Sequence, residues 1–311
     1  MTRRNQLGQA LVGGLAFARY TIGHFLNQPD NPTAFALLRF EAMDEPQVDD
    51  VHRHLFYELI WVDAGQSQQA IDYQRYPVGA GSLFFISPGQ VHEFEEWEPL
   101  RGGSILFTAD FFLLNQPDQD KLFELSFLDN FYANPLLHPA DADFRAIRQT
   151  IALLDTEYQR PDRADAVLQP LLHSLLAQIQ RCVDQQPGAG RVSRQYVVQY
   201  KQFRQLIDQH FATARSVSNY ADQLNLTPHH LNLICRQVTG QTAGGVIRTR
   251  VVLEAKRLLT FTDLPVSAIA AQLGYVDPSY FARLFRQQTG LSPQAFRLSG
   301  SATGMSEKYR Q

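Results

Sequence analysis

The sequence has few cysteines and no long hydrophobic run. Cys182 and Cys235 are the only cysteines among 311 residues, and they form no CxxC pair. We therefore expect no cysteine-based zinc site and no disulfide framework, and we expect both thiols to be reduced. No apolar run approaches the roughly 20 residues of a membrane-spanning helix. These absences predict a cytoplasmic protein without a membrane partner.

The N-terminus resembles a secretory signal only in outline. Arg3 and Arg4 precede a short apolar stretch at residues 10–18, as the charged and apolar regions of a signal peptide would. Two glycines interrupt this stretch and Arg19 follows it directly. We therefore do not expect a signal peptide.

Acidic residues become scarce toward the C-terminal end. Residues 1–190 contain 13 Lys/Arg and 25 Asp/Glu, a balance of −12, whereas residues 191–311 contain 15 and 6, a balance of +9; together these give −3. A basic segment joined to an acidic one predicts a polyanionic partner for the basic segment. Uneven surface charge without such a partner is the alternative.

A Pro/Gly-rich stretch divides the chain into two parts and predicts a linker at residues 184–190. Before it, residues 59–62 and 83–86 are apolar and typical of strands, and helical patterns begin near residue 118. Seven apolar residues between 167 and 179 recur at helical spacing. This stripe fits either the core or a subunit interface, and we favour the interface of a homodimer.

Two segments of the C-terminal part repeat each other, residues 217–240 and residues 266–290. Each predicts a short helix, a turn and a second helix. Thr227 and Asp277 are suited to cap the second helices, and each is followed by a proline at the first helical position. A glycine ends each second helix, where a left-handed conformation is common. The pattern predicts two helix-turn-helix units, and a helical hairpin repeat for protein contacts is the alternative.

Polar residues begin the second helix of each unit, and a helix of about 17 residues, roughly 25 Å long, connects the units. Short or planar polar side chains at a helix N-terminus suit contacts with bases in the major groove of double-stranded DNA. Arginines one turn later are better placed for phosphates. The predicted phosphate contacts are Arg236, Arg286 and Tyr280.

The last hundred residues resemble the DNA-binding domain of the AraC/XylS family of transcription regulators. The most specific stretch is GYVDPSYFARLFRQQTGLSPQAFR, residues 274–297. The resemblance implies base contacts by His229, Asn232, Ser279 and Arg283. It also implies activation of transcription, with RNA polymerase as a partner. Leu233 departs from the family, where many relatives have Arg or another polar residue, and so does Cys235, where Phe is usual.

The first half resembles the cupin barrel with which this family senses ligands. Residues 52–65 contain the first cupin motif, HxH, three residues, Glu, six residues and Gly, and residues 81–92 resemble the second motif. Alternation along a strand places His52, His54 and Glu58 on one face. With His92, they form a candidate pocket for an unknown small-molecule effector. A metal site for Zn, Fe(II), Mn or Ni and a structural role are the alternatives.

The sequence predicts an α+β protein. An N-terminal cupin-like β-barrel with a helical dimerisation segment covers residues 1–183, and the linker covers 184–190. An all-α double helix-turn-helix domain covers residues 191–300, and a tail covers 301–311. We expect a sequence-specific transcription activator controlled by an effector, with no enzymatic activity and no assigned cofactor or metal. The alternative is a cupin metalloenzyme with an accessory DNA-binding domain.

Overall fold

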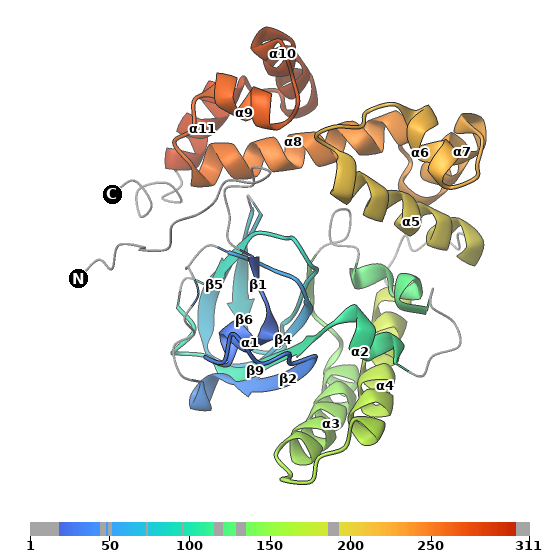
Figure 1. Ribbon diagram of the computed structural model, residues 1–311. Helices are drawn as coiled ribbons and strands as arrows, with labels where there is room; N and C mark the ends of the chain where they lie inside the picture. The colour runs from blue at the N-terminus through green and yellow to red at the C-terminus, as the bar shows by residue number, and fades with distance from the viewer. Residues whose placement is uncertain are drawn as a thin grey trace.

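The computed structural model describes residues 19–43, 48, 52–72, 74–94, 96–114, 121–128, 135–185 and 193–302. A region rich in β-strands lies below a layer of helices formed by the C-terminal third of the chain, and two further helices pack beside the strands (Figure 1). This arrangement confirms the predicted mixture of sheet and helix. The signal-like stretch at residues 10–18 lies outside the described residues.

The strands lie in the N-terminal part, which we call the β domain (residues 19–185). They are β1 Arg19–Tyr20, β2 Phe35–Arg39, β3 Arg53–His54, β4 Tyr57–Ala64, β5 Gln66–Ile71, β6 Gln74–Gly79, β7 Leu83–Ile86, β8 His92–Phe94, β9 Arg101–Phe107 and β10 Leu136–Leu137. A five-stranded antiparallel sheet has the order β10-β7-β4-β9-β2, and a three-stranded sheet has the order β6-β5-β8. Strands β1 and β3 form a parallel pair.

Strand β4 shows why the large sheet is buried on both faces. The predicted strands at 59–62 and 83–86 are confirmed as part of β4 and as β7. Leu59 and Trp61 pack into one hydrophobic cluster, whereas Ile60 and Val62 pack into another on the opposite face. Because successive side chains of a strand alternate, a continuous apolar run serves two cores.

Helices α3 Asp141–Tyr158 and α4 Asp165–Asp184 cover one face of this sheet. Five residues of the predicted stripe, Leu168, Leu172, Leu175, Leu176 and Ile179, are buried against the sheet. The expectation that the stripe forms a subunit interface is therefore wrong for these residues, because their own chain already covers them. Only Val167, at its edge, is exposed. Two shorter helices complete the β domain, α1 Ile22–Phe25 and α2 Ala109–Leu113.

Seven helices form the C-terminal part of the described chain, which we call the helical domain (residues 193–302). They are α5 Arg194–His210, α6 Val217–Gln223, α7 Pro228–Thr239, α8 Ala243–Phe261, α9 Val266–Gln272, α10 Pro278–Thr289 and α11 Pro293–Ala302. One hydrophobic cluster runs through all of them. Helix α4 extends to the first residue of the predicted linker, and α11 ends two residues beyond the predicted domain boundary at 300.

The repeat takes the predicted form. The Thr227 hydroxyl accepts a hydrogen bond from the backbone N–H of His230 at 3.1 Å, and the Asp277 carboxylate accepts one from Ser279 at 2.8 Å. Gly240 and Gly290 end their helices in the left-handed region, with φ of 73° and 79°. The second helix of each unit is therefore capped at both ends by the residues that the sequence indicated. Within the described residues, no helix is long and apolar enough to cross a membrane.

Candidate DNA-binding surface and ligand pocket

Helices α7 and α10 lie toward opposite ends of α8 (Figure 1). Each buries a stripe with a spacing of three and four residues: Leu231, Ile234 and Cys235 in α7, and Phe281, Leu284 and Phe285 in α10. These stripes confirm the predicted buried faces. Burial also raises the pKa of the Cys235 thiol to about 12. The opposite face of each helix is left for a partner.

The exposed face of α10 carries the second set of predicted contacts. Ser279 is exposed, and the Arg283 side chain is 72% exposed, with its guanidinium 3.9 Å from the carboxylate of Asp277. Tyr280 and Arg286 are exposed beside them. Arg283 can therefore reach outward from the first turns of the helix without breaking a buried contact.

Helix α7 differs from α10 at the outer position that Arg283 occupies in α10. His229 and Arg236 are exposed, as predicted contacts need to be. Leu233, at the position equivalent to Arg283, is 39% exposed and places an apolar side chain on the outer surface. At this position α7 therefore lacks the guanidinium donors that Arg283 offers in α10.

The predicted base contact Asn232 is engaged within the protein. Its amide nitrogen donates to the carbonyl oxygen of Pro228 at 2.9 Å, and its amide oxygen accepts from the backbone N–H of Ala243 at 3.0 Å. Ala243 begins α8, so Asn232 satisfies one of the unpaired N–H groups at that helix end. This internal role weighs against the base contact that the resemblance implied.

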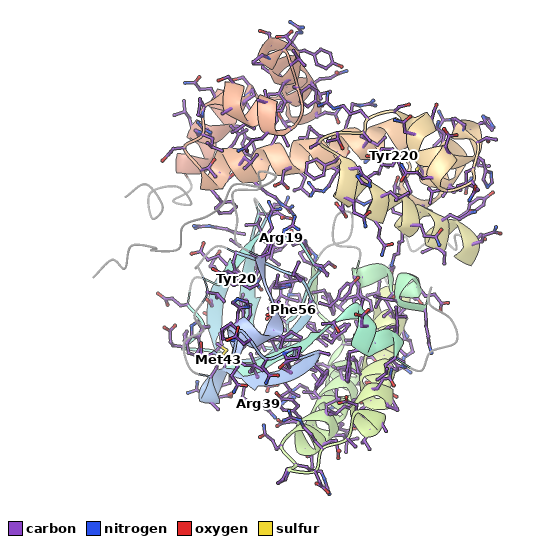
Figure 2. All side chains as sticks on the ribbon, in the orientation of Figure 1. Arg19, Tyr20, Arg39, Met43, Phe56 and Tyr220 are labelled. Carbon is purple, nitrogen blue, oxygen red and sulfur yellow. The ribbon has the colours of Figure 1, made fainter. Side chains whose placement is uncertain are left out.

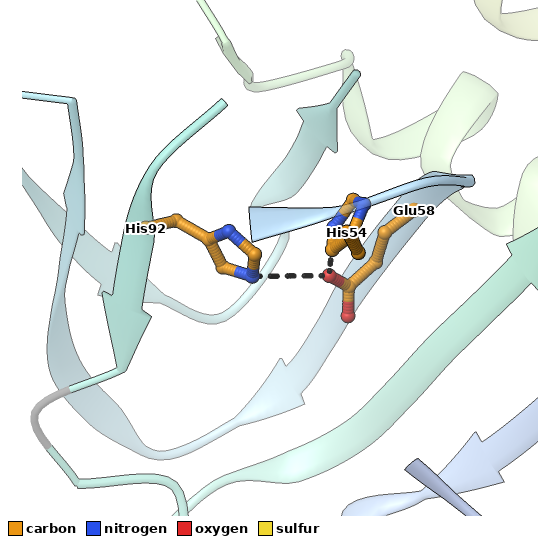
Figure 3. Close-up of side chains that lie close together, drawn as sticks. All are labelled: His54, Glu58 and His92. Carbon is orange, nitrogen blue, oxygen red and sulfur yellow. Dashed lines mark ion pairs between the residues drawn. The ribbon is translucent and has the colours of Figure 1, made fainter. Parts of the chain in front are cut away.

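The β domain brings the predicted histidines and glutamate together. Nε2 of His54 lies 3.4 Å and Nε2 of His92 lies 3.6 Å from the same oxygen of Glu58 (Figure 3). The ring of His52 lies 4.4 Å from that of His92, centroid to centroid. All four side chains are buried. The structure thus assembles the candidate pocket from β3, β4, β8 and the residue before β3.

Aromatic rings surround this cluster and keep it in a dry environment. Phe56, inside the β domain (Figure 2), stacks on His54 with centroids 4.0 Å apart, and Phe25 lies 5.2 Å from His52. Burial, and then the neighbouring His52, lowers the pKa of His54 to about 3. Burial likewise holds the pKa of His92 well below its usual value. Both imidazoles are therefore neutral at pH 7 and can act as ligands.

The donor set is compatible with a metal ion. One ligand atom from each of His54, Glu58 and His92 lies within 4.8 Å of the others. Nδ1 of His92 and both ring nitrogens of His54 are buried and make no well-formed hydrogen bond within the described part of the chain. Imidazole and carboxylate ligands suit Zn, Fe, Ni and Mn. His54, Glu58 and His92 would hold such an ion.

A cluster of buried charges, which the sequence did not predict, joins the two domains. Arg53 of β3 forms an ion pair with Glu254 of α8, and Arg257 pairs with both Glu254 and Asp72. We call these four residues the ionic latch. Arg250 also pairs with Glu254, at 3.1 Å. Three charged residues at positions i, i+4 and i+7 of α8, which share one face of the helix, were the available signal.

Glu254 and Arg257 of the latch are charged at neutral pH. Burial alone would raise the pKa of Glu254, but Arg53, Arg250 and Arg257 hold this pKa well below its usual value. Asp72 and Glu254 offset the burial of Arg257 and raise its pKa. A second contact between the domains involves α5, where the Lys201 ammonium donates to the carbonyl oxygen of Leu125 at 2.8 Å.

This fold defines a class of protein: a transcription regulator in which a β-rich ligand-binding domain precedes a helix-turn-helix DNA-binding domain. The chain belongs to the AraC family. Residues 35–224 match the family described as AraC-like ligand binding domain, and residues 220–299 match a helix-turn-helix domain. Proteins of this family are transcription regulators and not enzymes, and the metalloenzyme alternative is therefore wrong.

Similar proteins cover most of the chain. The HTH-type transcriptional activator RhaR of Cronobacter sakazakii is 25% identical over 249 residues, 79% of this chain and 86% of that protein. RhaS of Escherichia coli is 24% identical over 267 residues, which cover 81% of this chain and 89% of that protein. Among solved structures, ToxT from Vibrio cholerae is 14% identical with a TM-score of 0.38, covering 86% of this chain and 98% of that chain.

Proposed function

We propose that the protein activates transcription by placing α7 and α10 in successive major-groove segments on one face of a DNA duplex. The observation that carries this proposal is the duplicated, capped helix pair with exposed leading turns, built on one continuous core. His229, Ser279 and Arg283 contact bases. Asn232 is left out of this set because its amide is engaged at the start of α8.

Phosphate contacts supply most of the affinity in this proposal. Arg236, Arg286 and Tyr280 are exposed on the same two helices. Neutralising a phosphate releases condensed counterions, so affinity falls steeply as the salt concentration rises. The basic balance of residues 191–311 supports this arrangement.

The β domain senses a small effector in this proposal. Its three sheets form a cupin-like barrel, and His52, His54, Glu58 and His92 line the effector pocket. Residues 1–183 form the sensing and dimerisation domain, residues 184–190 the linker, residues 191–300 the DNA-binding domain and residues 301–311 a tail. A homodimer bridges two DNA half-sites and recruits RNA polymerase, and the effector shifts the population of its arrangements.

The test is a DNA-binding measurement on the full chain. Genome-wide mapping of bound DNA gives candidate sites, and fluorescence anisotropy then measures their affinity across a salt series. We expect a linear fall of log affinity with log salt concentration, together with tighter binding to a mapped site than to random duplex. If no double-stranded DNA shows salt-sensitive binding, the proposal is wrong.

A further inference from the structure

The histidine pocket and the ionic latch share a strand. Residues 52–54 alternate in direction, so His52 and His54 lie in the pocket while Arg53 lies between them and pairs with Glu254 of α8. Arg53 is 1% exposed and Glu254 is fully buried. A displacement of His54 toward the pocket therefore moves the backbone that carries Arg53.

The strand that carries His92 is also linked to the helical domain through the residue beside its histidine. Val91, the residue before His92, is fully buried and belongs to the hydrophobic cluster of the helical domain. The backbone of Val91 is hydrogen-bonded to Asp72, whose N–H donates to the Val91 carbonyl at 2.6 Å. The Asp72 carboxylate in turn binds Arg257. Both histidine-bearing strands are thus linked to α8 through the residue beside the histidine, directly by Arg53 and by way of Asp72 for Val91.

The pocket needs only a small movement to complete a metal site. Ligand atoms about 2.0–2.1 Å from a tetrahedral ion lie about 3.4 Å from one another. The two distances to Glu58, 3.4 Å and 3.6 Å, already match this spacing. All three donor atoms lie within 4.8 Å, so the His54 and His92 nitrogens would approach each other by no more than about 1.4 Å.

We propose that His54, Glu58 and His92 bind a divalent transition-metal ion, and that Arg53 and Val91 transmit its binding to α8. The regulatory half of this proposal rests on the proposed DNA-binding function. Two imidazoles and a carboxylate are a donor set for such ions, and three protein ligands leave a position open for water or a small effector. Small shifts in a packed interface are amplified because its arrangements are discrete.

The metal site is tested with Co²⁺, whose visible absorption reports nitrogen and oxygen ligands, on full-length protein without an affinity tag. We expect one Co²⁺ per chain, and we expect His54→Gln and His92→Gln each to weaken binding by more than about 100-fold, beyond the usual effect of an outer-shell change. His138→Gln, on an exposed histidine, is the matched control. If a histidine variant does not fold by circular dichroism, Glu58→Gln replaces it. No saturable Co²⁺ binding, or equal binding by all variants, overturns the proposal.

Transmission is tested by measuring DNA affinity with and without Co²⁺. We expect a change of about fivefold or more, the lower end of usual allosteric couplings, and DNA must change Co²⁺ affinity by the same factor. Glu254→Gln should keep Co²⁺ affinity and lose this response, whereas Glu98→Gln, the same substitution on an exposed turn, should keep both. If Glu254→Gln fails to fold, Val91→Ala replaces it. This substitution removes part of the Val91 side chain from the hydrophobic cluster of the helical domain and should reduce the response.

The two hypotheses fail in different ways. Absence of salt-sensitive DNA binding by metal-free protein contradicts the proposed function, and the Co²⁺ titration then still decides whether the metal site exists. Normal DNA binding that Co²⁺ does not change, or that changes equally in wild type and Glu254→Gln, contradicts transmission through the latch.

Discussion

At the scale of single residues, Arg283 and Asn232 differ in whether the protein itself engages their side chains. Arg283 is exposed in the leading turns of α10, whereas Asn232, near the start of α7, holds the N-terminus of α8. The sequence predicted both as base contacts because it shows residue type and position. It does not show that a neighbouring helix end has a backbone N–H that needs an acceptor.

Substituting the two arginines of α10 should separate base contacts from phosphate contacts. Arg283→Ala should cost about 1–3 kcal/mol on the specific site and relax selectivity at one base pair. Arg286→Ala should weaken all sequences alike and reduce the salt slope by about 1, because it removes one phosphate contact. Fluorescence anisotropy on specific and random duplexes measures both. Equal losses on both duplexes for both variants would contradict these roles.

Asn232→Ala should affect stability more than selectivity. The substitution leaves the Ala243 N–H without its acceptor, and loss of a helix cap typically costs about 0.5–2 kcal/mol. Chemical denaturation followed by circular dichroism measures the loss, with His229→Ala, on an exposed neighbour, as the control. If Asn232→Ala keeps full stability and loses preference for the specific site, Asn232 contacts bases after all.

At the scale of elements, the sequence predicted the helical domain well because its signals are local. Caps, prolines and glycines are read within a few residues, so α6, α7, α9 and α10 follow from the repeat. The strands were found where apolar runs are continuous. The stripe of α4 was interpreted wrongly, because periodicity shows that a face is buried and does not show which surface buries it.

Two glycines of the second unit should differ in their tolerance of alanine. Both adopt positive φ, 74° at Gly274 and 79° at Gly290. A Cβ at Gly274 would clash with the carbonyl oxygen of Ala212, whereas a Cβ at Gly290 would meet nothing within 4 Å. We expect Gly290→Ala to cost about 1–2 kcal/mol, from the backbone conformation alone. Gly274→Ala should cost clearly more.

Urea denaturation of the full chain, followed in the helical domain, measures this difference. Equal free energies of unfolding for the two variants would show that the close approach between the turn at Gly274 and the segment after α5 is relieved at no cost.

At the scale of the whole molecule, the sequence predicted two domains and could not predict how they meet. Arg53 and Glu254 are 201 residues apart, and no local pattern connects them. The proximity of His52, His54, Glu58 and His92 was predicted because the cupin motifs fix these residues. The latch was missed because a charged residue on a helix is read as solvent-facing until a partner domain is placed against it.

Acid should loosen the contact between the domains. The pKa of Glu254 is lowered on folding. Its contribution to the stability of the folded state is therefore present above the ordinary pKa of 4.5 and is lost as the pH falls below 4.5. We therefore expect amide hydrogen exchange in α8, corrected for intrinsic rates, to be constant above about pH 5 and to increase below it.

Glu254→Gln provides the control for this pH dependence, because it removes the titrating carboxyl. The variant should show faster exchange at neutral pH and a smaller further increase in acid. Identical pH profiles in wild type and variant would mean that other carboxyl groups govern the acid response.

The composition of the latch affects what happens when the domains separate. An apolar interface between the domains, if it opened, would expose hydrophobic surfaces that bind to other chains. Here Arg53, Asp72, Glu254 and Arg257 become ordinary hydrated ions on parting, while Arg250 and Arg257 remain within one helical turn of Glu254. If the domains part at this seam, water can solvate these side chains, so we expect a lower risk of aggregation than at a wholly apolar interface.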